Sequence, residues 1–209
     1  MSSAEPLDSA PSEDLRHGAG RADDRPAAPP WQGVHHLALV TRDLDATVRF
    51  YCGVLGMRVL LTRRSPGDGR PHLFIDAGGG ATLHFFEVPD ATIYTQPLQP
   101  GAFVPGALQH LSLRLPDEAA LRALQARLRA AGVAVTELFD QGPVRLCFFE
   151  DNNGIALEAT CWLIDPTARP VDYADGRFFA DPDPVPAVKE LARGRDLAPR
   201  PAPGGPPAE

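Results

Sequence analysis

The stretch HLALVTRD, residues 36–43, recurs as HLSLRLPD, residues 110–117, with the same His, Leu, Leu and Asp positions. In each copy, alternating apolar residues predict a strand, and an aspartate followed by leucines at helical spacing predicts a helix with that aspartate at its N-terminus. The two copies are offset by 74 residues (110 minus 36). The chain therefore contains an internal repeat that begins with a strand and a helix.

The remainder of each copy follows the same order, because each helix ends at a glycine and three strand-like runs come next. Two βαβββ modules are therefore predicted, in an α+β fold whose cupped mixed sheet has the helices on its outside. The expected strands are 36–41, 57–62, 72–77 and 81–88 in the first module, and 110–115, 133–138, 144–149 and 155–160 in the second.

The ends of the chain differ in composition from its middle. Residues 1–30 and 192–209 are rich in Pro, Ala, Gly and charged residues, so we expect them to be disordered. The folded domain is expected at 31–163, with module one at 33–90 and module two at 106–162. Residues 164–191 combine prolines with aromatic residues, which predicts a packed arm that ends in a short helix near 186–191.

Composition excludes several classes of function. A net charge of -7 without a basic run argues against a nucleic-acid partner. There is no apolar run long enough to cross a membrane, so no membrane partner is expected. Three cysteines without paired spacing, and no apolar signal-peptide core, predict a cytoplasmic protein with reduced thiols.

The repeat also pairs polar residues that can bind a metal. His36 corresponds to His110, and His84 corresponds to Glu158, each 48 residues further along its module (84 minus 36, 158 minus 110). The neighbouring His35 corresponds to Gln109. Because side chains alternate along a strand, His36 faces away from the leucines that contact the helix. Two modules related by a pseudo-twofold axis would bring all four positions together.

Three imidazoles and one carboxylate suit a divalent transition metal, and the same ligands accept Fe, Ni, Co, Zn or Mn. A glutamate inside a sheet needs a compensating partner, which a metal would provide. Ser112 shares the predicted cavity face with His110, and Arg145 lies on a nearby strand, so both are candidate substrate contacts. Arg63, Arg64 and Arg70 could hold an anionic substrate, although solvated surface charge explains them more readily.

The opening HHLALVTRDLDATVRFYCGVLGMRV and the closing FFEDNNGIALE resemble the vicinal oxygen chelate superfamily, which contains glyoxalases, bleomycin resistance proteins and extradiol dioxygenases. The resemblance implies a cup around one divalent metal, with His36, His84, His110 and Glu158 as its ligands and a small-molecule substrate with vicinal oxygens. It also implies that the chain forms a homodimer. Two departures are a missing proline in the turn at 151–154 and a histidine at position 84, where Glu or Gln is frequent.

Three activities compete under this resemblance. The first is a glyoxalase-type lyase or isomerase, with Glu158 as the catalytic base. The second is a non-haem Fe(II) dioxygenase that uses His36, His110 and Glu158, although Phe148 stands where ring-cleaving members carry a catalytic side chain. The third is an antibiotic-binding resistance protein without catalysis, which the full ligand set disfavours.

Overall fold

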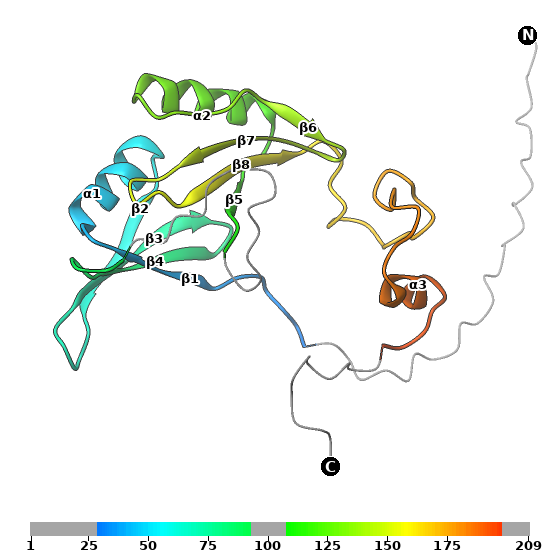
Figure 1. Cartoon of the computed structure of the whole chain (residues 1–209), viewed down its shortest axis with the longest axis horizontal. Helices are drawn as coiled ribbons and strands as arrows, with labels where there is room; N and C mark the ends of the chain where they lie inside the picture. The colour runs from blue at the N-terminus through cyan, green and yellow to red at the C-terminus, as the bar shows by residue number, and fades with distance from the viewer. Residues whose placement is uncertain (1–28, 93–107, 198–209) are drawn as a thin grey trace, which may run out of the picture. The chain divides into compact units, whose positions relative to one another are not determined.

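The computed structural model describes residues 29–92 and 108–197, and it confirms the predicted α+β fold with two βαβββ modules (Figure 1). Its elements, in chain order, are β1 (His36–Thr41), α1 (Leu44–Val48), η1 (Arg49–Val54), β2 (Arg58–Arg64), β3 (Pro71–Gly78), β4 (Ala81–Glu87), β5 (Leu111–Arg114), α2 (Glu118–Ala130), β6 (Phe139–Gln141), β7 (Val144–Glu150), β8 (Ala156–Trp162) and α3 (Pro186–Ala192).

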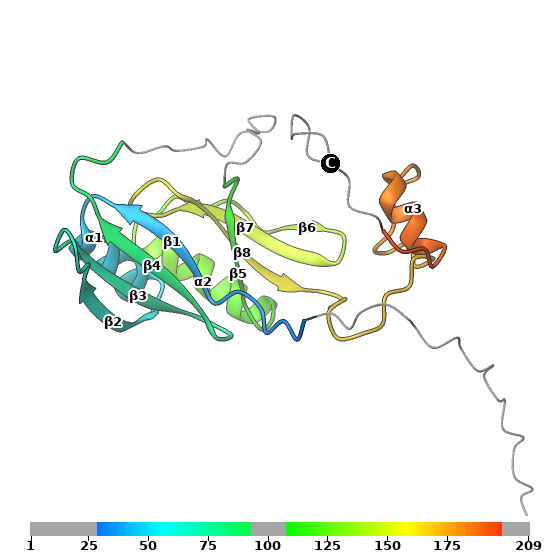
Figure 2. The same ribbon diagram turned by 90° about the horizontal axis from the view of Figure 1, so that it is seen from below.

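Each module forms its own four-stranded mixed sheet. The strand order is β1-β4-β3-β2 in module one and β5-β8-β7-β6 in module two, so the two sheets have the same topology (Figure 2). In each sheet the first strand pairs in parallel with the last, and the other pairings are antiparallel. The predicted cup is therefore built from two sheets that do not pair with each other in the described part of the chain.

The hydrophobic core lies on the helix-facing side of both sheets. Leu37 and Leu39 of β1 pack against it, whereas Ala38 and Val40 point away and are exposed, as the alternation predicts. Helix α2 covers one face of β7 and β8 (Figure 1). The buried core side chains are Phe50, Tyr51, Leu73, Ile75, Leu83, Phe85, Leu121, Leu128, Cys147, Phe149, Leu157, Ala159 and Cys161.

Both helices begin at the predicted aspartates. The Asp43 carboxylate accepts a hydrogen bond from the Ala46 amide, and the Asp117 carboxylate accepts one from Ala120, which caps the first turn of each helix. The first helix changes after one turn into the π-helix η1. Its last carbonyls, at Gly53 and Val54, accept hydrogen bonds from the Arg127 guanidinium on α2.

The strand predicted at 133–138 is wrong. This segment makes a single bridge, from Val135 to Phe149, and the regular strand of this region, β6, begins later at Phe139. The physical reason lies in α2, where the Gln125 side chain donates to the Thr136 carbonyl at 2.7 Å. That hydrogen bond occupies a carbonyl that the sequence pattern assigned to the strand.

A buried polar network joins the two modules. Tyr51, fully buried in module one, donates its hydroxyl proton to Asp151 Oδ2 of module two at 3.0 Å. Asp151 Oδ1 also accepts from the amides of Asn153 and Ile155, at 2.8 Å each. Thr41 Oγ1 donates to Asn153 Oδ1 at 2.7 Å. The turn before β8 is therefore fixed by module one as well as by its own backbone.

The chain outside the modules is only partly described. Of the described residues, 29–32 belong to a different compact unit from the modules, which begin at Gly33. The predicted disordered end at 1–30 lies outside the described residues except for its last two positions, and the tail at 192–209 is described only up to residue 197. The expected short helix is present as α3. Among the described residues, no helix has the length and apolar character needed to span a membrane.

Candidate functional site

Glu158 lies in the middle of β8, on the face of the sheet opposite to α2. Its neighbours across the strands are Ser112 of β5 and Phe148 of β7. Only 8% of Glu158 is exposed, and Ser112 Oγ donates to its Oε1 at 2.6 Å. The second oxygen, Oε2, lies 3.3 Å from His110 Nε2. His110 and Glu158, two of the predicted ligands, are therefore neighbours.

His110 directly precedes β5, and the Gln109 side chain contacts the edge of its ring that faces away from Glu158. The Gln109 side-chain oxygen contacts His110 Nδ1, which leaves Nε2 directed towards Glu158. The Phe148 ring lies edge-on to the imidazole, with the ring centroids 5.3 Å apart. A cavity of about 280 Å³ opens beside His110, between residues 39–42 of module one and residues 153–156 of module two.

In module one, His84 occupies the position that corresponds to Glu158. It lies on β4 between Ala38 of β1 and Phe74 of β3, and its ring stacks on Phe74 with a centroid distance of 3.9 Å. His72 Nδ1 lies 2.7 Å from His84 Nε2. Burial lowers the pKa of His84 below its ordinary value, and the neighbouring His72 and His36 lower it further. His84 is thus favoured as a neutral imidazole.

His36 lies at the exposed start of β1. Its ring centroid is 5.8 Å from that of His84, and its Nδ1 lies 2.8 Å from Nδ1 of His35. The parity prediction holds, because His36 shares a face with Ala38 and Val40, and these point away from the core. His36 and His84 therefore form a second pair of predicted ligands, on module one.

The four predicted ligands lie in two pairs, one on each sheet. Within residues 29–92 and 108–197, no three His, Cys, Asp or Glu side chains are grouped closely enough to hold a metal ion. The chemistry of the donors suits a divalent metal, since imidazoles and a buried carboxylate are its usual protein ligands. Within one chain, however, each pair supplies only part of a coordination shell.

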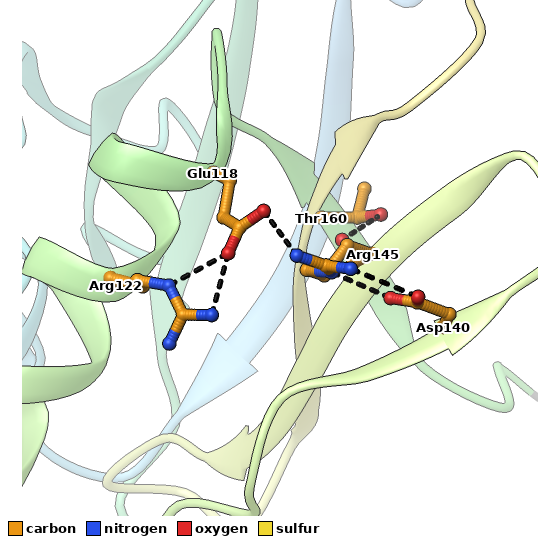
Figure 3. Close-up of polar contacts among 5 residues, drawn as sticks. All are labelled: Glu118, Arg122, Asp140, Arg145 and Thr160. Atoms are coloured by element: carbon orange, nitrogen blue, oxygen red, sulfur yellow. Dashed lines mark hydrogen bonds and ion pairs between the residues drawn. The ribbon is translucent and has the colours of Figure 1, made fainter.

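The structure contradicts one predicted substrate contact, Arg145. This residue lies opposite Cys161 in the sheet, so its side chain points to the α2 face and away from Glu158. Figure 3 shows its guanidinium between the carboxylates of Glu118 on α2 and Asp140 on β6. Both carboxylates raise the pKa of Arg145 above its ordinary value, with Asp140 contributing most. Arg145 therefore has a structural role, whereas Ser112 does lie beside Glu158.

Sequence reasoning missed His72. A 74-residue shift places His72 on Leu146, so the repeat gives no indication of it. The signal was in the strand parity, because His72 is two residues before Phe74 on a predicted strand. The hairpin that closes at Gly78–Gly80 places Phe74 beside His84 and His72 beside Phe86. Alternation then puts His72, Phe74 and His84 on one face of the sheet.

Comparison with known proteins identifies the fold family. The model of the Glyoxalase/Bleomycin resistance protein/Dioxygenase superfamily matches residues 33–159. MhqA of Bacillus subtilis (strain 168), named as a candidate ring-cleaving dioxygenase, is 28% identical over 134 residues, which cover 61% of this chain and 40% of MhqA. The chain therefore spans less than half the length of this curated relative.

Solved structures agree in fold. The glyoxylase/bleomycin resistance protein/dioxygenase domain from Frankia sp. EAN1pec is similar, with a TM-score of 0.54 and 28% identity, over 63% of this chain and 98% of that domain. A candidate dioxygenase from Bacillus subtilis subsp. subtilis str. 168 has a TM-score of 0.52 and 23% identity, over 65% of this chain and 44% of that protein. With two βαβββ modules and a family model that covers most of both, this chain belongs to the glyoxalase/bleomycin resistance protein/dioxygenase superfamily.

Proposed function

We propose that this protein is a divalent-metal-dependent lyase or isomerase of the glyoxalase type, acting on a small substrate with vicinal oxygens. The observation that carries the proposal is the environment of Glu158. This carboxylate is buried on the face of the module-two sheet opposite to α2. Among the described side chains, its polar contacts are one hydroxyl, from Ser112, and one imidazole, from His110. A buried carboxylate with so few hydrogen-bond donors is suited to binding a cation.

The four residues His36, His84, His110 and Glu158 are proposed as the metal ligands. A bound divalent metal would act as a Lewis acid on adjacent substrate oxygens. Glu158 would accept the substrate proton on Oε2, while the Ser112 hydroxyl holds Oε1 in place. His110, with Gln109 on its other nitrogen, would keep its Nε2 directed at the same centre.

A homodimer accounts for the separation of the ligands into two pairs. We propose that module one of one copy faces module two of a second copy, so that each complete site draws ligands from both. The exposed face of β1 supports this arrangement, since His36, Ala38 and Val40 are all accessible and Val40 is 49% exposed. Exposed apolar side chains and exposed proposed ligands on one face of a sheet are suited to an interface between two copies of the chain.

A non-haem Fe(II) dioxygenase is the second candidate. It is favoured by the likeness to MhqA, which is named as a candidate ring-cleaving dioxygenase. His36, His110 and Glu158 would then serve as two imidazoles and a carboxylate on one face of the iron. Phe148, the cross-strand neighbour of Glu158, offers no group for acid or base catalysis. A binding protein without catalysis is the third candidate, and the lack of a three-ligand cluster within the described residues favours it.

The deciding experiment measures bound metals by plasma mass spectrometry in full-length protein purified without a histidine tag. Near one equivalent per chain is expected in wild type, with loss in His36→Ala, His110→Ala and Glu158→Ala. Glu137→Ala is the control, because this exposed glutamate pairs with Arg129 and contacts no proposed ligand. Nickel, cobalt or zinc would support proton transfer, and iron would support oxygenation. If wild type stays metal-free after anaerobic reconstitution, both metalloenzyme candidates would be excluded, and the binding protein without catalysis would be the remaining candidate.

A further inference from the structure

The face of the module-one sheet opposite to α1 carries an aromatic surface beside one arginine, Arg63, that has no ion-pair partner among residues 29–92 and 108–197. We call this surface the open face. Two rows of side chains cross it from β2 to β1, because residues paired across neighbouring strands point to the same side. One row is Arg63, His72, Phe86 and Val40, and the next is Leu61, Phe74, His84 and Ala38.

The rings of the open face are packed together and partly accessible. Phe74 and His84 stack at 3.9 Å with an interplanar angle of 17°, and His72 stacks on Phe86 at 5.1 Å and 20°. His72, Phe74 and Phe86 are half-buried, and Leu61 beside them is 39% exposed. Aromatic side chains in contact offer faces and edges on which a further flat ring can pack.

Arg63 differs from the other arginines of this region. Arg64 donates to the Gly69 carbonyl, Arg70 pairs with Asp68, and Arg58 pairs with Asp76. No hydrogen bond or ion pair of Arg63 is present among the described residues. The two rows of the open face also contain no carboxylate. A protein with a net charge of -7 thus presents, in the part of the chain that the structure describes, a guanidinium without a carboxylate partner beside a set of rings.

We propose that the open face binds a flat aromatic ring that bears a carboxylate, with Arg63 as the residue that receives the carboxylate. A guanidinium binds a carboxylate through two parallel hydrogen bonds, and the rings supply apolar contact for the aromatic part. This inference rests on the proposed function and names the substrate class: an aromatic acid whose remaining oxygens extend towards the ligand residues. Arg63 is then a specificity-determining residue.

The test uses full-length protein and two probes of the same shape, naphthoate and its neutral amide, naphthamide. Neither probe has the vicinal oxygens that chelate a metal. Equilibrium dialysis should show that wild type binds naphthoate about tenfold more tightly than naphthamide. Arg63→Gln should lose this preference and leave naphthamide binding unchanged. Arg64→Gln is the matched control, since the neighbouring side chain points to the other face, and it should behave as wild type.

Phe74→Leu keeps Arg63 and should weaken both probes equally. Circular dichroism of each variant confirms that the fold is retained. Equal affinity of wild type for the two probes, no binding in the millimolar range, or an unchanged preference in Arg63→Gln would overturn the inference. The dialysis is repeated after treatment with a chelator. Failure of the proposed metal function would leave naphthoate binding intact, and failure of this inference would leave the metal content intact.

Discussion

Replacement of Tyr51 by Phe should destabilise the protein without disturbing its core. The phenol ring is fully buried and packs beside Phe85, with centroids 5.1 Å apart, and Phe preserves these contacts. The variant loses one hydrogen bond, the 3.0 Å bond to the buried carboxylate of Asp151. A hydrogen bond to a charged group contributes about 1.5–3 kcal/mol. We expect the free energy of unfolding in urea to fall by that amount.

Tyr173→Phe is the matched control. Tyr173 packs against Phe179 but makes no hydrogen bond through its hydroxyl among the described residues, so its loss should change stability by less than about 0.5 kcal/mol. Equal stability losses for the two tyrosines, or no loss for Tyr51→Phe, would refute the view that the Tyr51–Asp151 bond holds the modules together.

The contribution of Tyr51 to the free energy of unfolding should also depend on pH. Burial, followed by the nearby Asp151 carboxylate, raises the pKa of Tyr51 well above its usual value of about 10. Above pH ~10 the unfolded tyrosine ionises while the folded one keeps its proton, so the unfolded state binds fewer protons and wild-type stability falls. Below pH ~10 the Tyr51 hydroxyl makes its full contribution to the free energy of unfolding. The difference in stability between wild type and Tyr51→Phe should therefore narrow as the pH rises above ~10.

Three further outcomes follow from the structure. Arg145→Ala should keep the metal content of wild type and lose only a small part of its stability in urea unfolding, since the ion pairs of Arg145 with Asp140 and Glu118 are partly exposed; loss of metal would show that Arg145 belongs to the site. Ser112→Ala should bind metal about 10–100-fold more weakly in chelator competition, because Glu158 Oε1 loses its donor; unchanged affinity would contradict that role. The Cys147 thiol, whose pKa burial and the nearby Glu158 raise to about 11, should resist alkylation at pH 8 in native protein, as peptide mass spectrometry would show, and label only on unfolding.

The repeat predicted most of the fold because its signals are local. The aspartate caps, the alternation in β1 and the glycine stops each depend on a few adjacent residues, and all of them are present in the structure. The errors arose where a distant side chain decides the outcome. Gln125 of α2 takes a carbonyl from the segment predicted as a strand, and no local pattern in that segment indicates it.

The candidate site was predicted from position, and position alone does not fix the partners of a side chain. Arg145 is a predicted substrate contact only because it lies on a strand near the predicted site. Parity excludes it, because Phe148 is the cross-strand neighbour of Glu158 and Arg145 is an odd number of residues away from Phe148. The register of the β7–β8 hairpin therefore indicates that Arg145 and Glu158 lie on opposite faces of the sheet.

The two halves of the proposed site have diverged in how each stabilises its central residue. His84 stacks on Phe74 and contacts a second imidazole, His72, and its burial, followed by the nearby His72, lowers its pKa and favours the neutral side chain. Glu158 is supported by a hydroxyl and an imidazole, which can donate to a carboxylate. Equivalent positions of the repeat thus present a neutral donor on one sheet and an acidic group on the other. Under the proposed function, a substrate between these faces would meet Glu158 on module two and aromatic side chains on module one. Such a site would orient an asymmetric molecule although the fold that builds it is nearly symmetric.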